Sequence, residues 1–91
     1  INGEIVFQSP AKLRHTNAIK LLTTLLSSFV IKNDLGFVGG EKMLISLTRN
    51  DYEPDVCFFE KSKSQDFKSD QMQFPAPDLA VEVLSPSTEK F

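Results

Sequence analysis

Apolar residues recur at helical spacing between Lys12 and about Lys32, and this pattern predicts one long helix. The apolar positions, three and four residues apart, are Ile19, Leu22, Leu25, Leu26 and Phe29. The polar residues that lie largely opposite them are Lys20, Thr24, Ser27 and Ser28. Leu21 and Val30 widen the apolar face, so we expect the helix to pack broadly on a sheet. The turn-forming residues Asn33, Asp34 and Gly36 predict its end.

The rest of the chain is dominated by short β-type runs. A strand is predicted over residues 1–8, before the helix, and three more after it, at residues 37–38, 43–47 and 52–59. Residues 60–73 are polar and predict a flexible loop with an exposed Phe67. The most strand-like run is 78–84, and Ser85-Pro86 then resembles the start of a second helix. The element order predicts a helix packed on a mixed or largely antiparallel sheet, which is an α/β or α+β arrangement.

Composition restricts the chain to one small domain over residues 1–91. A net charge of −2 gives no overall attraction to polyanions, so any binding of nucleic acid has to be local. The lone Cys57 excludes an intrachain disulfide and favours a reducing cytoplasm. The apolar stretch 18–31 is too short and too polar to cross a membrane, so no membrane association is expected.

Two acids in the strand-like runs have no evident structural purpose. Both faces of the run 78–84 are mostly apolar, as in a central strand, which places Glu82 inside a buried element. Asp55 lies at the entry of an earlier strand, on the same face as Cys57 and Phe59. Unpaired buried carboxylates are costly, so a divalent cation is a suitable partner for both acids if the strands are neighbours. Glu4, in the first predicted strand, is a candidate third acid.

Structural explanations for these residues remain open. Glu82 could pair with Arg14, Lys12 or backbone amides, and Asp55, which follows a proline, could cap a turn. Asp78 also follows a proline at a strand start, where a structural role is favoured. His15 is interpreted as a packing or capping residue, because there is no second histidine for a metal site.

The residues around the two acids resemble a known family. Pro54-Asp55, followed by the run from Pro77 through Glu82 to Thr88, resembles the Uma-two family of restriction-endonuclease-like proteins. The upstream order agrees: Asn2-Gly3-Glu4-Ile5, then Ser9-Pro10, then His15 opening a long helix.

The resemblance implies a PD-(D/E)XK nuclease fold, with a mixed sheet flanked by helices. It also implies Mg²⁺ or Mn²⁺ as the cofactor, DNA as the partner and phosphodiester hydrolysis in a bacterial cytoplasm. Asp55 matches the motif aspartate, Glu82 matches the motif acid of the next strand, and Glu4 matches an early glutamate of the family.

The chain departs from this pattern after Glu82. The motif lysine is expected two residues after the acid, where Leu84 stands, and the resemblance places the family's lysine beyond Phe91. The chain therefore resembles the N-terminal half of the domain, without its C-terminal part, and self-association into a homodimer is a further expectation. Two rival interpretations remain: a catalytically inactive module that binds protein or nucleic acid, and a structural fragment whose acids form ordinary ion pairs.

Overall fold

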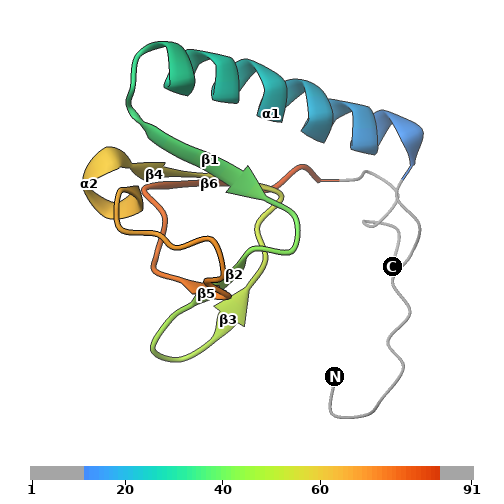
Figure 1. Cartoon of the computed structure of the whole chain (residues 1–91). Coiled ribbons are helices and arrows are strands. Elements are labelled where there is room, and N and C mark those ends of the chain that lie inside the picture. The colour runs from blue at the N-terminus through green and yellow to red at the C-terminus, as the bar shows by residue number, and fades with distance from the viewer. Residues whose placement is uncertain (1–11, 85–91) are drawn as a thin grey trace.

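The computed structural model describes residues 12–84, in which one long helix packs on one of two small sheets (Figure 1). In chain order the elements are α1 (Leu13–Lys32), β1 (Gly36–Gly40), β2 (Leu44–Ser46), β3 (Asp51–Tyr52), β4 (Val56–Glu60), α2 (Lys61–Ser64), β5 (Gln73–Phe74) and β6 (Leu79–Val81). The strand predicted over residues 1–8 and the helix predicted to begin at Ser85 lie outside the described residues. The mixed α/β class predicted from the sequence is confirmed.

Helix α1 begins and ends where the apolar pattern predicts. At its C-terminus the Asn33 side chain donates a hydrogen bond to the Phe29 carbonyl oxygen at 2.8 Å. Asp34 then adopts a φ of 52°, a left-handed conformation that breaks the helix. Gly36 follows with a φ of 150°, and a Cβ on this residue would overlap the Phe59 carbonyl oxygen. A glycine at this position therefore lets β1 start directly against β4.

Six short strands form two sheets of three. In the first sheet the order is β1-β4-β6, with both neighbouring pairs antiparallel. In the second, β2 lies between β3, which is antiparallel to it, and β5, which is parallel. Helix α1 lies on the outer face of the first sheet, and the second sheet lies on the opposite side (Figure 1).

The core lies between the two sheets. Ile45 from β2 and Cys57 and Phe59 from β4 are fully buried. The partly buried side chains that pack around them are Met43, Tyr52, Phe67 and Phe74. The rings of Phe67 and Phe59 pack edge to face with their centroids 5.0 Å apart. The prediction of an exposed Phe67 is therefore wrong. Although its sequence neighbours are polar, its ring packs on the core and holds the connection 61–72 against it.

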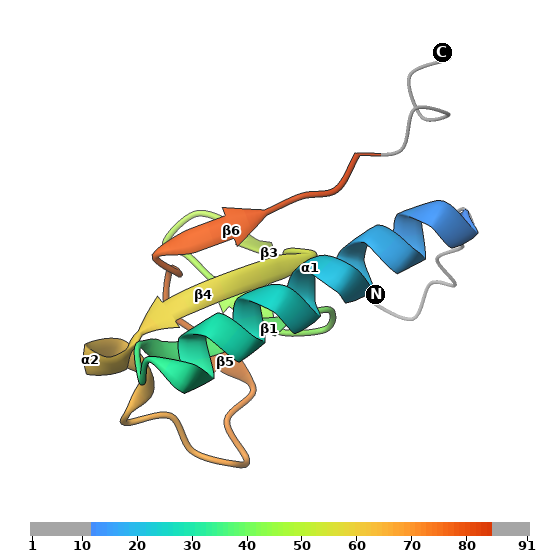
Figure 2. The same ribbon diagram turned by 90° about the horizontal axis from the view of Figure 1, so that it is seen from above.

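Helix α1 buries a narrower face than the sequence predicts. Val30 is buried, but Leu21, Leu25 and Phe29 are exposed by 61%, 61% and 58%. The helix contacts β1 and β4 and runs along that side of the sheet, leaving β6 uncovered on this face (Figure 2). A narrow contact of this kind buries only one stripe of the helix, so the broad apolar face predicted for it is only partly used.

The strands predicted over residues 52–59 and 78–84 differ in their bounds from the strands of the structure, and the loop predicted between them contains regular structure. The run 52–59 is not one strand, because Glu53, Pro54 and Asp55 interrupt it between β3 and β4. The segment predicted as a flexible loop, 60–73, contains the single helical turn α2 and the first residue of β5. The strand predicted over residues 78–84 is confirmed only for Leu79–Val81.

Candidate active site

The antiparallel pairing of β4 and β6 brings the two candidate acids together. Val56 pairs with Val81, and Asp55 and Glu82 are the next residues outward on the two strands. Asp55 lies in a bend and Glu82 just past the end of β6, so both lie outside the paired residues, and continuing the register by one residue would set them opposite each other. The strands that begin after Asp55 and end before Glu82, β4 and β6, are neighbours in the sheet, in line with the sequence-based expectation.

A hydrogen bond closes this end of the strand pair. The backbone N–H of Val83 donates to Oδ2 of Asp55 at 2.8 Å. The bond orients the Asp55 carboxylate and holds the backbone directly after Glu82. Oδ1 of Asp55 has no hydrogen-bond partner among residues 12–84, so this oxygen remains available to a ligand.

Asp78 makes the corresponding contact at the other end of the pair. Its Oδ2 accepts the backbone N–H of Glu60 at 2.7 Å, and its own N–H donates to the Phe58 carbonyl oxygen at 2.8 Å. The Glu60 hydrogen bond, with a smaller contribution from the charge of Lys63, lowers the pKa of Asp78. Asp78 is thus a strand-end cap, as favoured from the sequence.

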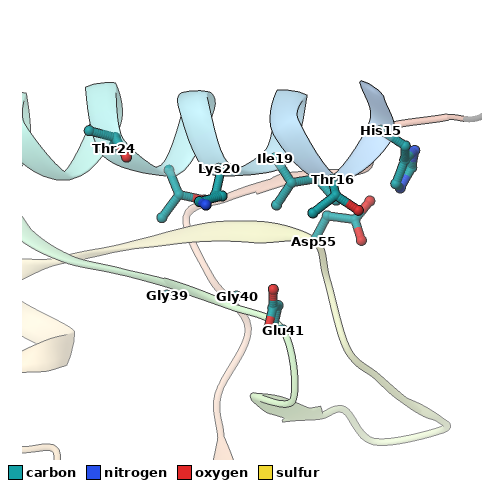
Figure 3. Close-up of a pocket in the computed structure, with 10 residues that line it drawn as sticks. His15, Thr16, Ile19, Lys20, Thr24, Gly39, Gly40, Glu41 and Asp55 are labelled. Carbon is teal, nitrogen blue, oxygen red and sulfur yellow. The ribbon is translucent and has the colours of Figure 1, made fainter. Parts of the chain in front are cut away.

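A groove opens beside Asp55, between α1 and the end of β1. It has a volume of about 730 Å³. The residues that line it are His15, Thr16, Ile19, Lys20, Thr23, Thr24, Gly39, Gly40, Glu41 and Asp55. Figure 3 shows the Asp55 side chain beneath the first turns of α1 and Glu41 pointing toward the same space from the β1–β2 turn. The groove gives solvent and ligands direct access to the Asp55 carboxylate.

Glu82 differs from its sequence-based description. It is exposed, and in the described part of the chain β6 is an edge strand, not a central one. The prediction of a buried Glu82 is therefore wrong, because no further strand or helix covers this edge within residues 12–84. Asp55 is half-buried in a bend directly before β4, so it does not share the core-facing side of Cys57 and Phe59. Glu4 lies outside the described residues.

Burial gives Cys57 a structural role. The thiol lies in the core between the sheets, and desolvation raises its pKa, with a smaller opposing effect from a hydrogen bond to the backbone of Gly39. A thiol held in its neutral form is a poor nucleophile and a poor metal ligand. The interpretation of Cys57 as a small hydrophobic residue agrees with this position.

The acid pair suits a hard divalent cation in its donor chemistry. Mg²⁺ and Mn²⁺ prefer carboxylate oxygens, and Mg²⁺ commonly keeps several waters beside one or two carboxylates. Asp55 offers a free oxygen and Glu82 an exposed carboxylate, so two protein ligands are at hand. Residues 12–84 hold no cluster of three or more metal-ligating side chains. Water or substrate oxygens would have to complete the coordination.

Three groove residues were not identified as site residues from the sequence. In the sequence, Lys20 is one of the polar residues opposite the apolar helix face, Thr16 belongs to no motif, and Glu41 lies in an inconspicuous turn. Thr16, Lys20 and Thr23 lie along one side of α1, and this spacing is the feature that could have indicated the two helix residues, Thr16 and Lys20. His15 also lines the groove, and its Nδ1 is shielded from solvent without a hydrogen-bond partner in the described region. Of the packing and capping roles expected for His15, packing agrees with its half-buried position, whereas no side-chain hydrogen bond caps the start of α1.

Fold and site together define a mixed α/β domain with paired acids at one end of a sheet, consistent with a restriction-endonuclease-like fold. The chain belongs to the Uma2 family, described as "Putative restriction endonuclease", whose model matches residues 1–91. The family assigned from sequence resemblance is confirmed, and membership indicates a nuclease-type function with nucleic acid as the partner. Comparison with curated proteins gives no match. Within residues 12–84, no helix combines the length and the apolar character needed to span a bilayer.

Proposed function

We propose that the chain is a metal-dependent nuclease domain that hydrolyses phosphodiester bonds of DNA, with Asp55 and Glu82 as its metal ligands. The observation that carries the proposal is the β4–β6 register, which, continued by one residue beyond Val56 and Val81, would set the two acids opposite each other at one end of the sheet. Family membership supports the same reaction class.

Each acid has a distinct task in this proposal. Asp55 is held by the Val83 N–H and offers its second oxygen to the cation, while the exposed Glu82 supplies the other carboxylate. A bound Mg²⁺ or Mn²⁺ supplies Lewis-acid polarisation of the phosphodiester and lowers the pKa of an attacking water. The side chains orient the cation, and their two negative charges favour its binding over that of a monovalent ion. Glu4 is kept in the proposal as a third ligand.

The nucleic acid has to be attracted locally. With a net charge of −2, the whole chain does not attract DNA. At the site itself, a cation would have to neutralise the acid pair before a phosphate can approach. The preference for DNA, a cytoplasmic and bacterial setting and a homodimeric state remain predictions from the sequence.

A second candidate function is a nuclease-fold module that binds nucleic acid or protein without cleaving. Leu84 stands where the motif lysine is expected, and the described residues present two acids without a third ligand. With a divalent cation on the acid pair but no lysine beside it to stabilise the developing negative charge, the site would bind a phosphate but accelerate its hydrolysis little.

The two candidates are separated by a cleavage assay on plasmid and linear duplex DNA in Mg²⁺ or Mn²⁺. The nuclease proposal predicts cleavage that chelation abolishes and that falls about 100-fold or more in Asp55→Asn and Glu82→Gln. Glu53→Gln is the matched control, because Glu53 is an exposed acid two residues before Asp55. DNA binding without cleavage in any divalent metal would favour the inactive module and refute the nuclease.

A further inference from the structure

Lys20 is the lysine among the residues that line the groove beside Asp55. It comes from α1, on the side of the groove opposite Gly39, Gly40 and Glu41. One helical turn separates it from Thr16, which is about 6 Å along the helix axis. Lys20 and Asp55 both line the groove, and Figure 3 shows Lys20 further along α1, with the Asp55 carboxylate directed toward the His15 end.

The ion pairs of the described region leave Lys20 available. Lys61 pairs with Asp34, and Lys63 pairs with Asp78 at 3.4 Å. Lys20 has no ion-pair partner among residues 12–84, and its side chain is exposed. A free ammonium at the rim of a groove can contact an anion without first breaking a protein contact.

The side of α1 that lines the groove carries hydroxyl groups as well as the Lys20 ammonium group. Thr16, Thr23 and Thr24 line the groove together with Lys20. A lysine with neighbouring hydroxyl donors matches a phosphodiester, which offers unesterified oxygens as hydrogen-bond acceptors and carries one negative charge. Two carboxylates, Glu41 and Asp55, border the groove on its other side and would repel a free anion unless a cation neutralises them.

We propose that Lys20 contacts a backbone phosphate of a nucleic-acid strand that lies in the groove between α1 and the end of β1. Lys20 positions the strand next to the Asp55–Glu82 pair and reads no base. The assignment rests on the proposed function, because the strand approaches only when the acid pair holds its divalent ion.

The test is the affinity of a fluorescent 20-base-pair DNA duplex for the chain, measured by anisotropy in Ca²⁺ over a range of salt concentrations. Lys20→Met is expected to weaken binding about five- to tenfold near 0.1 M salt and to reduce the slope of log affinity against log salt by about 0.9. The loss should be equal for duplexes of unrelated sequence, because a phosphate contact carries no sequence information. Lys20→Arg should keep most of the affinity.

Lys32→Met is the matched control, a lysine in the last turn of the same helix and outside the groove. Equal affinity and salt slope for wild type and Lys20→Met, or equal losses in Lys20→Met and Lys32→Met, would overturn the assignment of Lys20. A parallel Mn²⁺ titration of the wild type tests the proposed function separately. Retained Mn²⁺ binding with an unaffected Lys20→Met would refute Lys20 alone, whereas a wild type that binds neither Mn²⁺ nor DNA would refute both.

Discussion

Asp55 and Val83 are joined across the β4–β6 pair by a hydrogen bond from the Val83 N–H to Oδ2 of Asp55, 2.8 Å long. Asp78 and Glu60 repeat the same relationship at the other end of the pair. Each aspartate follows a proline, and each caps the partner strand just beyond its last paired residue. The two Pro-Asp pairs are therefore equivalent structural caps, and what distinguishes Asp55 is the groove beside it and Glu82 opposite it.

Removing the Asp55 carboxylate should loosen the end of β6. In Asp55→Ala the Val83 N–H loses an acceptor with a formal charge, so we expect a stability loss of about 1.5 kcal/mol and faster amide exchange at Val83. Asp55→Asn keeps a side-chain oxygen and should largely preserve both. Amide hydrogen exchange followed by NMR measures the effect, and unchanged exchange at Val83 in Asp55→Ala would contradict the assigned bond.

Asp78 should contribute stability that depends on pH. Its pKa is lowered in the folded state, so its contribution is fully present above the unfolded-state pKa of about 4 and is lost as the pH falls through the lower folded value. The difference in urea midpoint between wild type and Asp78→Ala should therefore be largest near neutral pH and shrink below about pH 4. Asp70→Ala, which removes an exposed acid from the connection before β5, is the control for the loss of one carboxylate. A difference that stays constant down to pH 2 would argue against the cap.

The two neighbouring residues Val30 and Ile31 should respond very differently to truncation. Val30 is 2% exposed and Ile31 is 76% exposed on the same helix. Val30→Ala should cost about 2 kcal/mol through lost burial and a small cavity. Ile31→Ala should stay within about 0.5 kcal/mol of wild type. Urea denaturation measures both, and equal costs would mean that α1 packs in a different rotation.

Gly40 and Gly39 form a matched pair for the wall of the groove. A Cβ at Gly40 would overlap the carbonyl oxygen of Asp55, a backbone atom that cannot move without shifting the start of β4. At Gly39 the nearest obstacle is the end of the flexible Met43 side chain. Gly40→Ala should therefore destabilise the fold by about 2 kcal/mol or more and weaken metal binding, and Gly39→Ala should do less of both. Thermal unfolding with and without Mn²⁺ compares the two variants, and a Gly39→Ala more damaging than Gly40→Ala would contradict this packing.

The sequence predicts α1 almost to the residue, because helical periodicity is a local property that a single segment displays in full. Its packing face was harder to predict. Leu25 and Phe29 follow the apolar pattern, yet they are exposed because, within residues 12–84, the sheet beneath α1 offers only β1 and β4 as contacts. The fraction of an apolar helix face that becomes buried depends on the width of the sheet on which the helix packs. A local sequence pattern carries no information about that width.

The sequence indicates the two acids of the candidate site, but not the exposure of Glu82 or the groove beside Asp55. The strands next to Asp55 and Glu82 are neighbours, as expected, but the prediction of a buried Glu82 is wrong, because this residue is exposed beside an edge strand. Apolar residues on both faces of a run do not distinguish a central strand from an edge strand in so small a sheet. Lys20 was assigned to a solvated face because the groove forms only when α1 meets the end of β1, a contact between segments distant in sequence.

The measurement that tests the account most directly is a calorimetric titration of Mn²⁺ into the wild-type chain and into its Glu82→Gln, Asp55→Asn and Glu53→Gln variants. Asp55 and Glu82 share one cation in this account, so the wild type and Glu53→Gln should bind with a single saturable transition. Either substitution in the acid pair should weaken that binding about tenfold or more. Equal Mn²⁺ affinity in all four folded proteins, or no binding by the wild type, would contradict the shared metal site.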